Sequence, residues 1–166
     1  MTEQTIKATD ATIREIVEQE IERLGNEADL NHIDVSAVTD MSKLFQRSEF
    51  NGNIAQWDVS NVVDMTQMFR RAAFKGDLSK WNVSNVKSMS AMFFDNKNFI
   101  HWNNNHDVLS QWDVSNVEDM WGMFSNSEFM GDLTNWNLRN VRNTEKMFFA
   151  SPLREKYGRN GENLKR

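Results

Sequence analysis

Cysteine is absent from the 166-residue chain, and proline occurs only once. Without Cys there can be no disulfide, no thiolate metal ligand and no cysteine nucleophile. No apolar run of about 18 residues is present, so we expect no membrane span. The first residues contain no apolar stretch of the kind that directs export, and there is no Cys for lipid attachment. We therefore expect a cytoplasmic protein as given, or a cell-surface protein if an export signal was removed.

Charge is unevenly distributed along the chain, although the net charge is only −5. Residues 1–31 hold three basic and eight acidic side chains, whereas residues 136–166 hold eight basic and three acidic ones. Two solvated ends, or electrostatic steering of a partner, would both account for this asymmetry. The acidic total and the lack of an aromatic-interleaved basic motif argue against a nucleic-acid partner.

A repeat with a period of 24 residues dominates the sequence. The motif W-D-V-S-N-V-V-D-M-T-Q-M-F begins at residue 57, and similar motifs begin at four other positions. The five coils, numbered one to five, start at Ile33, Trp57, Trp81, Trp112 and Trp136. A fixed period of this length indicates stacked coils. Coils three and four start 31 residues apart, and we place this insertion at residues 99–110.

Each coil contains three apolar clusters with different spacing. The first alternates, as in a short strand. The second, for example Val62, Met65, Met68 and Phe69, has the i, i+3, i+6, i+7 spacing of one or two helical turns. The third is a lone Phe followed after one residue by Gly, which predicts a chain reversal. The sequence therefore predicts an α/β repeat on the leucine-rich-repeat plan, with a column of Trp in the core. A second column, of repeated Ser-Asn pairs, is expected to satisfy backbone groups in the turns.

The ends of the chain differ from the coils. Residues 10–25 have an apolar stripe at helical spacing and end at Gly25, which predicts a helix that caps the first coil. We expect a flexible tail at 1–9, one solenoid domain over 10–153 with repeats at 33–153, and a polar basic tail at 154–166.

The motif W-D-V-S-N-V-x-x-M-x-x-M-F with a trailing F-x-G-D-L-S resembles the BspA-like leucine-rich-repeat family of bacterial surface proteins. The resemblance covers most of the chain, from about Ile13 to Leu153. It implies a right-handed solenoid related to leucine-rich repeats, used for binding other proteins and often found at cell surfaces. It supplies no catalytic residues.

Aromatic residues stand at coil positions that are otherwise polar. Position nine after the coil start is Trp121 in coil four, and position thirteen is Phe94 in coil three and Phe149 in coil five. Phe94 and Trp121 should lie on neighbouring coils and one outer face. Together with Trp102 of the insertion and Phe149 of coil five, they are candidates for a protein-binding or self-association surface. The alternative is that the insertion folds over these rings, so that they pack within the chain and contact no partner.

Catalytic signatures are weak throughout. Asp40, Asp64 and Asp119 recur at one repeat position, which is typical of turn caps rather than acid–base pairs. His101, His106 and Asp107 could be drawn as a metal site or the centre of a metal-dependent enzyme, but no fourth ligand is specified. We therefore expect no enzyme, metal or cofactor. The preferred function is a non-catalytic interaction module, such as a small cytoplasmic inhibitor or immunity-type protein, with a surface adhesin as the alternative.

Overall fold

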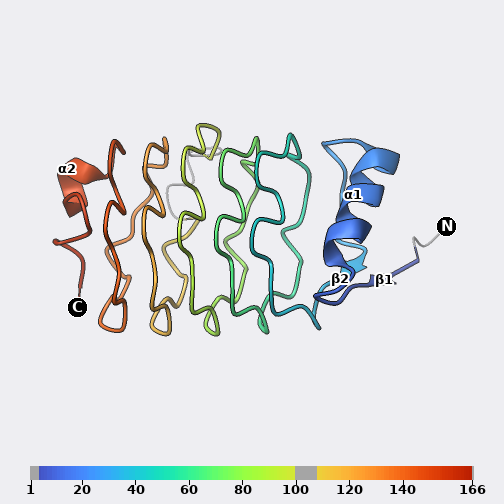
Figure 1. Cartoon of the computed structure of the whole chain (residues 1–166), viewed down its shortest axis with the longest axis horizontal. Helices are drawn as coiled ribbons and strands as arrows, with labels where there is room; N and C mark the ends of the chain where they lie inside the picture. Colours follow the sequence, from blue (N-terminus) through green and yellow to red (C-terminus); the bar gives the residue numbers. More distant parts are fainter. Residues whose placement is uncertain (1–3, 100–107, 166) are drawn as a thin grey trace.

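The computed structural model describes residues 4–99 and 108–165. Figure 1 shows a row of coils along the longest axis of the molecule, with the N-terminus at one end and the C-terminus at the other. Regular elements lie towards the two ends: β1 (Ile6–Lys7), α1 (Ile13–Leu24), β2 (Ile33–Asp34) and α2 (Arg154–Tyr157). β1 and β2 pair in parallel as a two-stranded sheet.

Neighbouring coils are joined at equivalent repeat positions. Parallel bridges connect Asp40 to Asp64, Asp64 to Ser88, Ser88 to Asp119 and Asp119 to Asn143. Residues that are one repeat apart, or one repeat plus the insertion, therefore lie side by side. The backbone polar groups of one coil are satisfied by the next coil, which is how segments without long strands can be packed together.

Tight turns replace the helical turns that the sequence predicts in each coil. Lys43, Gln67, Ala91 and Lys146 share one repeat position, and their φ angles lie between 52° and 59°. A residue in this left-handed region interrupts an α-helix. The N–H groups also point to the neighbouring coil, as in the bond from Lys43 N to the Thr66 carbonyl (2.8 Å). Hydrogen bonding between coils therefore prevails over the helical spacing of the apolar residues.

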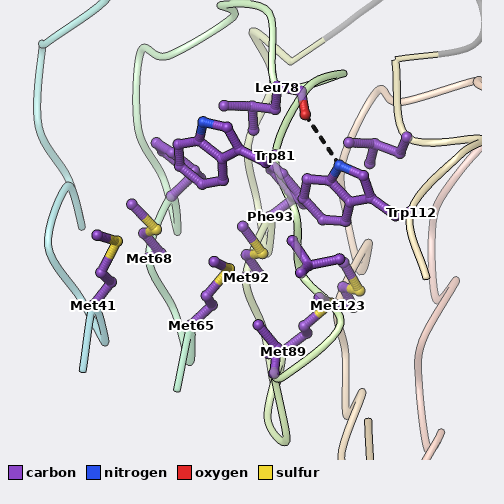
Figure 2. Close-up of a cluster of buried hydrophobic side chains, with 14 of the residues drawn as sticks. Met41, Met65, Met68, Leu78, Trp81, Met89, Met92, Phe93, Trp112 and Met123 are labelled. Carbon is purple, nitrogen blue, oxygen red and sulfur yellow. Dashed lines mark hydrogen bonds between the residues drawn. The ribbon is translucent and has the colours of Figure 1, made fainter. Parts of the chain in front are cut away.

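A column of buried tryptophans runs through the core. The column is Trp57, Trp81, Trp112 and Trp136. Each indole N–H donates to a carbonyl in the preceding turn of the stack, at 2.9–3.1 Å. Figure 2 shows this bond between Trp112 and Leu78, beside a group of buried methionines. The polar atom of every ring in the column thus has a partner inside an apolar core.

Two columns of phenylalanine accompany the tryptophans. One is Phe45, Phe69, Phe93, Phe124 and Phe148, and the other is Phe50, Phe74, Phe99 and Phe129. Successive rings of the first column are 5.6–5.8 Å apart between centroids. Phe99 therefore belongs to the core of coil three, and Leu109 is buried as well. Both ends of the segment expected as an insertion are thus anchored in the core, while residues 100–107 lie outside the described part.

The glycines after Phe50 and Phe74 are required by close packing. At Gly76, an added Cβ would lie 2.6 Å and 2.8 Å from two ring carbons of Phe74. At Gly52, it would lie 1.9 Å from the Ala28 carbonyl oxygen. The Phe-x-Gly motif therefore lets the returning chain pass directly over the ring, since no larger residue fits there.

Repeated asparagines cross-link the coils, as the sequence predicts for the Ser-Asn column. The side-chain amides of Asn61, Asn85, Asn116 and Asn140 each donate to the carbonyl of a serine one coil earlier, at 2.6–2.8 Å. These amides satisfy turn carbonyls that the parallel bridges do not reach. The prediction of a structural role for this column is confirmed.

Helix α1 lies across the N-terminal end of the stack (Figure 1), inside the range 10–25 that the sequence predicts for a helix. Ile13 and Val17 are buried in the core, whereas Leu24, also in the expected apolar stripe, is 39 % exposed. Gly25 follows with a φ of 91°, as a helix stop requires. The apolar face of the helix thus covers the end of the core.

Asp10 completes this end of the stack in an unexpected way. Its carboxylate accepts hydrogen bonds from Thr39 N (2.7 Å), the Thr39 hydroxyl (2.7 Å) and Asp40 N (3.0 Å). In the next coil the equivalent N–H groups, of Val63 and Asp64, donate to the Thr39 carbonyl instead. The Asp10 carboxylate therefore takes the place of a main-chain carbonyl from a preceding coil, because α1, and not another coil, comes before coil one.

The N-terminal segment is not the flexible tail expected over residues 1–9. In the part that is described, Ile6 and Lys7 form β1 against β2, and Ala8 is buried. Ile6 N donates to the His32 carbonyl and Ala8 N to the Asp34 carbonyl. The short sequence around Ile6 therefore adds one more strand to the edge of the first coil.

The C-terminal segment is likewise no loose tail, contrary to the expectation for 154–166. Tyr157 and Leu164 are buried, and Leu138 N donates to the Lys165 carbonyl at 2.8 Å. The segment is rich in charge, but the burial of these two side chains and backbone hydrogen bonds hold it against coil five.

Candidate functional site: a row of cationic and aromatic side chains

Four side chains from four consecutive coils form a row along one edge of the stack, the edge made by the turns at positions nine to fourteen of each coil. Phe94 and Trp121 stack with 6.1 Å between their centroids and 5° between their planes. The guanidinium carbon of Arg70 lies 5.0 Å from the Phe94 centroid, and Nζ of Lys146 lies 5.8 Å from that of Trp121. We call Arg70, Phe94, Trp121 and Lys146 the cation–aromatic row. All four are half-buried, so they are held in place and still reach solvent.

Local sequence explains why the two rings can stack. Gly122 stands at the repeat position that holds Gln67 in coil two and Lys146 in coil five. Its φ is 57°, and an added Cβ would lie 3.4 Å from the Phe94 ring. Phe94 therefore occupies the space that a longer side chain takes in other coils. The Asp119 carboxylate accepts from Trp121 N at 2.9 Å and fixes the turn that carries the indole.

Arg70 is positioned but lacks a counter-ion. Its Nη1 donates to Gln67 Oε1 at 3.2 Å, and its buried Nε has no hydrogen-bond partner. Within residues 4–99 and 108–165 no carboxylate pairs with it. Its neighbour Arg71, in contrast, binds Asp95 at 2.9 Å. Sequence reasoning missed Arg70 and Lys146, although Arg70 stands at the repeat position of Phe94 and Lys146 stands one position after that of Trp121.

The edge that carries the row is basic within an acidic protein. Positions nine to fourteen of the five coils contain Lys43, Arg47, Arg70, Arg71 and Lys146 as cations. They contain two acidic residues, Asp95 and Glu145, so this edge has a net charge of +3 while the whole chain has −5. The edge therefore presents positive charge together with exposed aromatic surface.

The other predicted site residues are not joined to this row by a described contact. Phe149 is 42 % exposed and lies under the Arg159 guanidinium, 5.0 Å from its centroid. Ser125 stands at the same repeat position in coil four and separates Phe149 from Phe94. Trp102 lies outside the described residues, so the alternative of packing within the chain under the insertion stays open.

Potential metal and acid–base residues take structural positions where they are described. Asp40, Asp64 and Asp119 each accept from the N–H two residues ahead, at 2.7–2.9 Å, and so stabilise turns. In the described ranges, no group of three His, Asp or Glu side chains could hold a metal ion. His101, His106 and Asp107 fall outside those ranges.

Glu20, His32 and Arg23 form a polar cluster under α1. Glu20 is buried, and its Oε2 lies 2.6 Å from Arg23 Nη2 and 2.7 Å from His32 Nε2. The Arg23 hydrogen bond, followed by that of His32, holds the pKa of Glu20 below its ordinary value despite burial. The cluster joins the helix to the residue just before the first coil.

Two surface pockets occur elsewhere on the stack. One, of about 280 Å³, is lined by Lys87, Asn116, Glu118, Arg139, Asn140, Val141 and Arg142. In it Glu118 lies 3.8 Å from Lys87 and 3.5 Å from Arg142, so these cations are already partly neutralised. The other, of about 350 Å³, lies over the Phe-x-Gly turns at Gly52 and Gly76. Neither pocket has an aromatic side chain among its lining residues, whereas the cation–aromatic row has two.

A family model described as "Mycoplasma protein of unknown function, DUF285" matches residues 13–109 and again residues 94–158. The chain belongs to this family. The two matches together span all five coils and overlap across the insertion. No curated protein and no solved structure matches the chain. No helix in the described part of this family member is long and apolar enough to cross a membrane.

Proposed function

We propose that this protein is a non-catalytic protein–protein interaction module on a right-handed solenoid of the leucine-rich-repeat type. The stacked, parallel-bridged coils and the BspA-like motif support the choice of scaffold. The function rests on one observation, the cation–aromatic row. Aromatic and arginine side chains that are rigidly held yet exposed are the commonest anchors of protein interfaces.

The rings of the cation–aromatic row leave apolar surface in water unless a partner covers them. At the position of Trp121 other coils carry Ser42, Thr66 and Ser90. At the position of Phe94 other coils carry Gln46, Arg70 and Ser125. Replacing such polar residues by Phe94 and Trp121 leaves part of two large rings in water, where their burial would be worth about 1.5–3 kcal/mol each. A partner that covers the rings recovers this free energy. A small inhibitor or immunity-type protein would use the row in this way to cover its target.

The experiment is a comparison of binding by two surface variants. Trp121→Ser restores the polar side chain of other coils, and Val63→Ser removes an apolar side chain that is 42 % exposed elsewhere on the stack. The wild-type protein would first be used to capture partners from the native host. Partners that Trp121→Ser fails to capture would be purified and titrated against each variant by calorimetry. We expect Trp121→Ser to weaken the purified complex at least tenfold, about 1.4 kcal/mol, and Val63→Ser to leave it unchanged.

Self-association is tested in the same samples by analytical ultracentrifugation. A dimer that Trp121→Ser dissociates also supports the proposal, with a second copy as the partner. If Trp121→Ser instead loses several kcal/mol of stability and every interaction stays intact, the rings pack within the chain and the proposed site is wrong.

A further inference from the structure

We propose that the cation–aromatic row receives an acidic segment of a partner protein, with a carboxylate on Arg70 and apolar side chains on Phe94 and Trp121. This inference rests on the proposed function and adds the chemistry of the partner. It is carried by the geometry of Arg70, by the charge of the edge and by the length of the row.

Arg70 is arranged as a receptor for a carboxylate. Its guanidinium is fixed between the Phe94 ring and Gln67 Oε1, and Gln67 is itself held by Gln46 Nε2 at 2.8 Å. The Nη2 donors make no hydrogen bond with any described residue. Because Nε is buried and Nη1 is shared with Gln67, a carboxylate would approach the guanidinium at its Nη1–Nη2 end. A guanidinium that is already ordered loses little side-chain entropy when it binds a carboxylate through two parallel hydrogen bonds. Partial burial also strengthens the attraction compared with an exposed pair.

Lys146 supplies a second, weaker cationic site at the other end of the row. Its Nζ lies 3.5 Å from Glu145 Oε1, but both side chains are exposed, at 42 % and 65 %. Such pairs contribute little and exchange readily for another carboxylate. A bound segment would therefore meet a positive charge at each end and aromatic rings between them.

The length of the row predicts a spacing in the partner. Arg70 and Lys146 stand three coils apart, which is about 15 Å at the usual separation of parallel chains. An extended peptide rises about 3.3 Å per residue. The partner segment should therefore carry two acidic residues about four or five positions apart, with apolar or aromatic residues between them.

A nucleic acid fits this surface less well than an acidic peptide. Its affinity depends on many phosphate contacts, and the chain as a whole is negatively charged at −5. Asp95 and Glu145 lie on the same edge and would face the phosphates of any longer strand. A segment with two separated carboxylates needs only two cations, so it meets less of this repulsion than a strand of phosphates does.

The experiment selects ligands without assuming one. A displayed library of random linear peptides is selected on the immobilised full chain, and the enriched peptide is synthesised for titration against purified variants. We expect enrichment of Asp or Glu at the stated spacing around apolar residues. Binding should fall by about tenfold or more with Arg70→Gln, because one half of a partly buried charge pair is removed. Arg70→Lys should bind at an intermediate level, because it keeps the charge and loses the fork.

Arg71→Gln is the matched control, because it changes the net charge by the same amount next to the row but removes an arginine already paired with Asp95. It should bind as wild type does. Equal losses for Arg70→Gln and Arg71→Gln would overturn the inference, since general charge would then suffice.

The outcomes separate this inference from the proposed function. Enriched peptides that need Trp121 but contain no acidic residues would overturn the acidic partner and leave the interaction module standing. Failure to select any peptide that depends on Trp121 or Arg70 would overturn both. A thymidine oligonucleotide that binds more tightly than the best peptide, and loses binding with Arg70→Gln, would show a nucleic-acid site and overturn the inference.

Discussion

At the scale of single residues, the tryptophans divide into two kinds. Trp81 is 4 % exposed, and its Nε1 donates to the Ile54 carbonyl at 3.1 Å. Trp121 has the same side chain, but it is half-buried and packs on Phe94 and Lys146 at the edge. The same amino acid therefore lies in the core in one place and reaches solvent in the other.

Trp81→Ala should lower the free energy of unfolding by roughly 3–5 kcal/mol, as expected when a large buried side chain is deleted. Trp121→Ala, measured beside it by urea unfolding, should cost only about 1 kcal/mol, since a stacked pair contributes about 0.5–1.5 kcal/mol beyond its buried area. A loss of less than about 1 kcal/mol for Trp81→Ala would place that ring at the surface and overturn the assignment of the Trp column to the core.

Asp10 gives the molecule a pH-dependent contact at its N-terminal end. The Thr39 hydroxyl, and then the N–H groups of Asp40 and Thr39, hold the pKa of Asp10 below its ordinary value of 3.8. Because the folded pKa is depressed, the carboxylate stabilises the fold fully above pH 3.8 and loses this effect as the pH falls through the lower folded value.

Asp10→Ala should therefore cost about 1–2 kcal/mol near neutral pH, at the lower end for hydrogen bonds to a charge because water can replace the acceptor. Urea unfolding as a function of pH measures this difference, which should shrink once Asp10 is protonated in the folded wild type. Asp58→Ala, which removes an acceptor bonded within one turn to Ser60, is the control. A difference that does not change with pH would contradict the role of the ionised carboxylate.

At the scale of elements, the C-terminal segment is fixed by one tyrosine of α2. Tyr157 OH donates to the Asp132 carboxylate at 2.8 Å and accepts from the buried Leu133 N–H at 2.9 Å. Hydrogen bonds from Thr134 and Tyr157 hold the pKa of Asp132 far below its ordinary range, and Lys156 adds a bond at 3.1 Å. The helix is therefore joined to the end of coil four through the buried Leu133 N–H and the exposed Asp132 carboxylate.

Tyr157→Phe should lower the free energy of unfolding by about 1–3 kcal/mol, because it leaves the Leu133 N–H buried without a partner. Hydrogen exchange should rise in residues 158–165 before it rises in coil three. Lys156→Gln, which removes an exposed ion pair with Asp132 and a cation–π contact with the Tyr157 ring, should cost less than about 1 kcal/mol. Equal effects of the two variants would show that the charge, rather than the phenol hydroxyl, holds the segment.

The repeat made the interior of the stack predictable, but not its ends. Equivalent residues such as Trp57 and Trp81 could be aligned in space because a period of 24 brings them into one column. The contact of Phe94 with Trp121 was predicted in the same way. The conformation at Lys43 could not be read from helical spacing, because its N–H bonds to another coil. The packing of the terminal segments depends on single residues, such as Asp10 and Tyr157, that are not part of the repeat.

At the scale of the whole molecule, the coils form a single row whose two ends are covered. Each coil contacts its neighbours through the Trp and Phe columns, so an uncovered end exposes a full cross-section of the core. Helix α1 covers one such end with Ile13 and Val17. The basic edge then runs along the side of the stack, where a partner can reach it without disturbing either cap.

The most direct test of this central claim is the unfolding of the chain that lacks residues 1–25, compared with the full chain by urea titration and sedimentation. The account predicts that the shortened chain exposes Ile33 and the rest of the first cross-section, and therefore aggregates or loses its single cooperative transition. If it remains a monomer and unfolds at the same urea concentration and with the same steepness as the full chain, the first coil needs no cap and the account is contradicted.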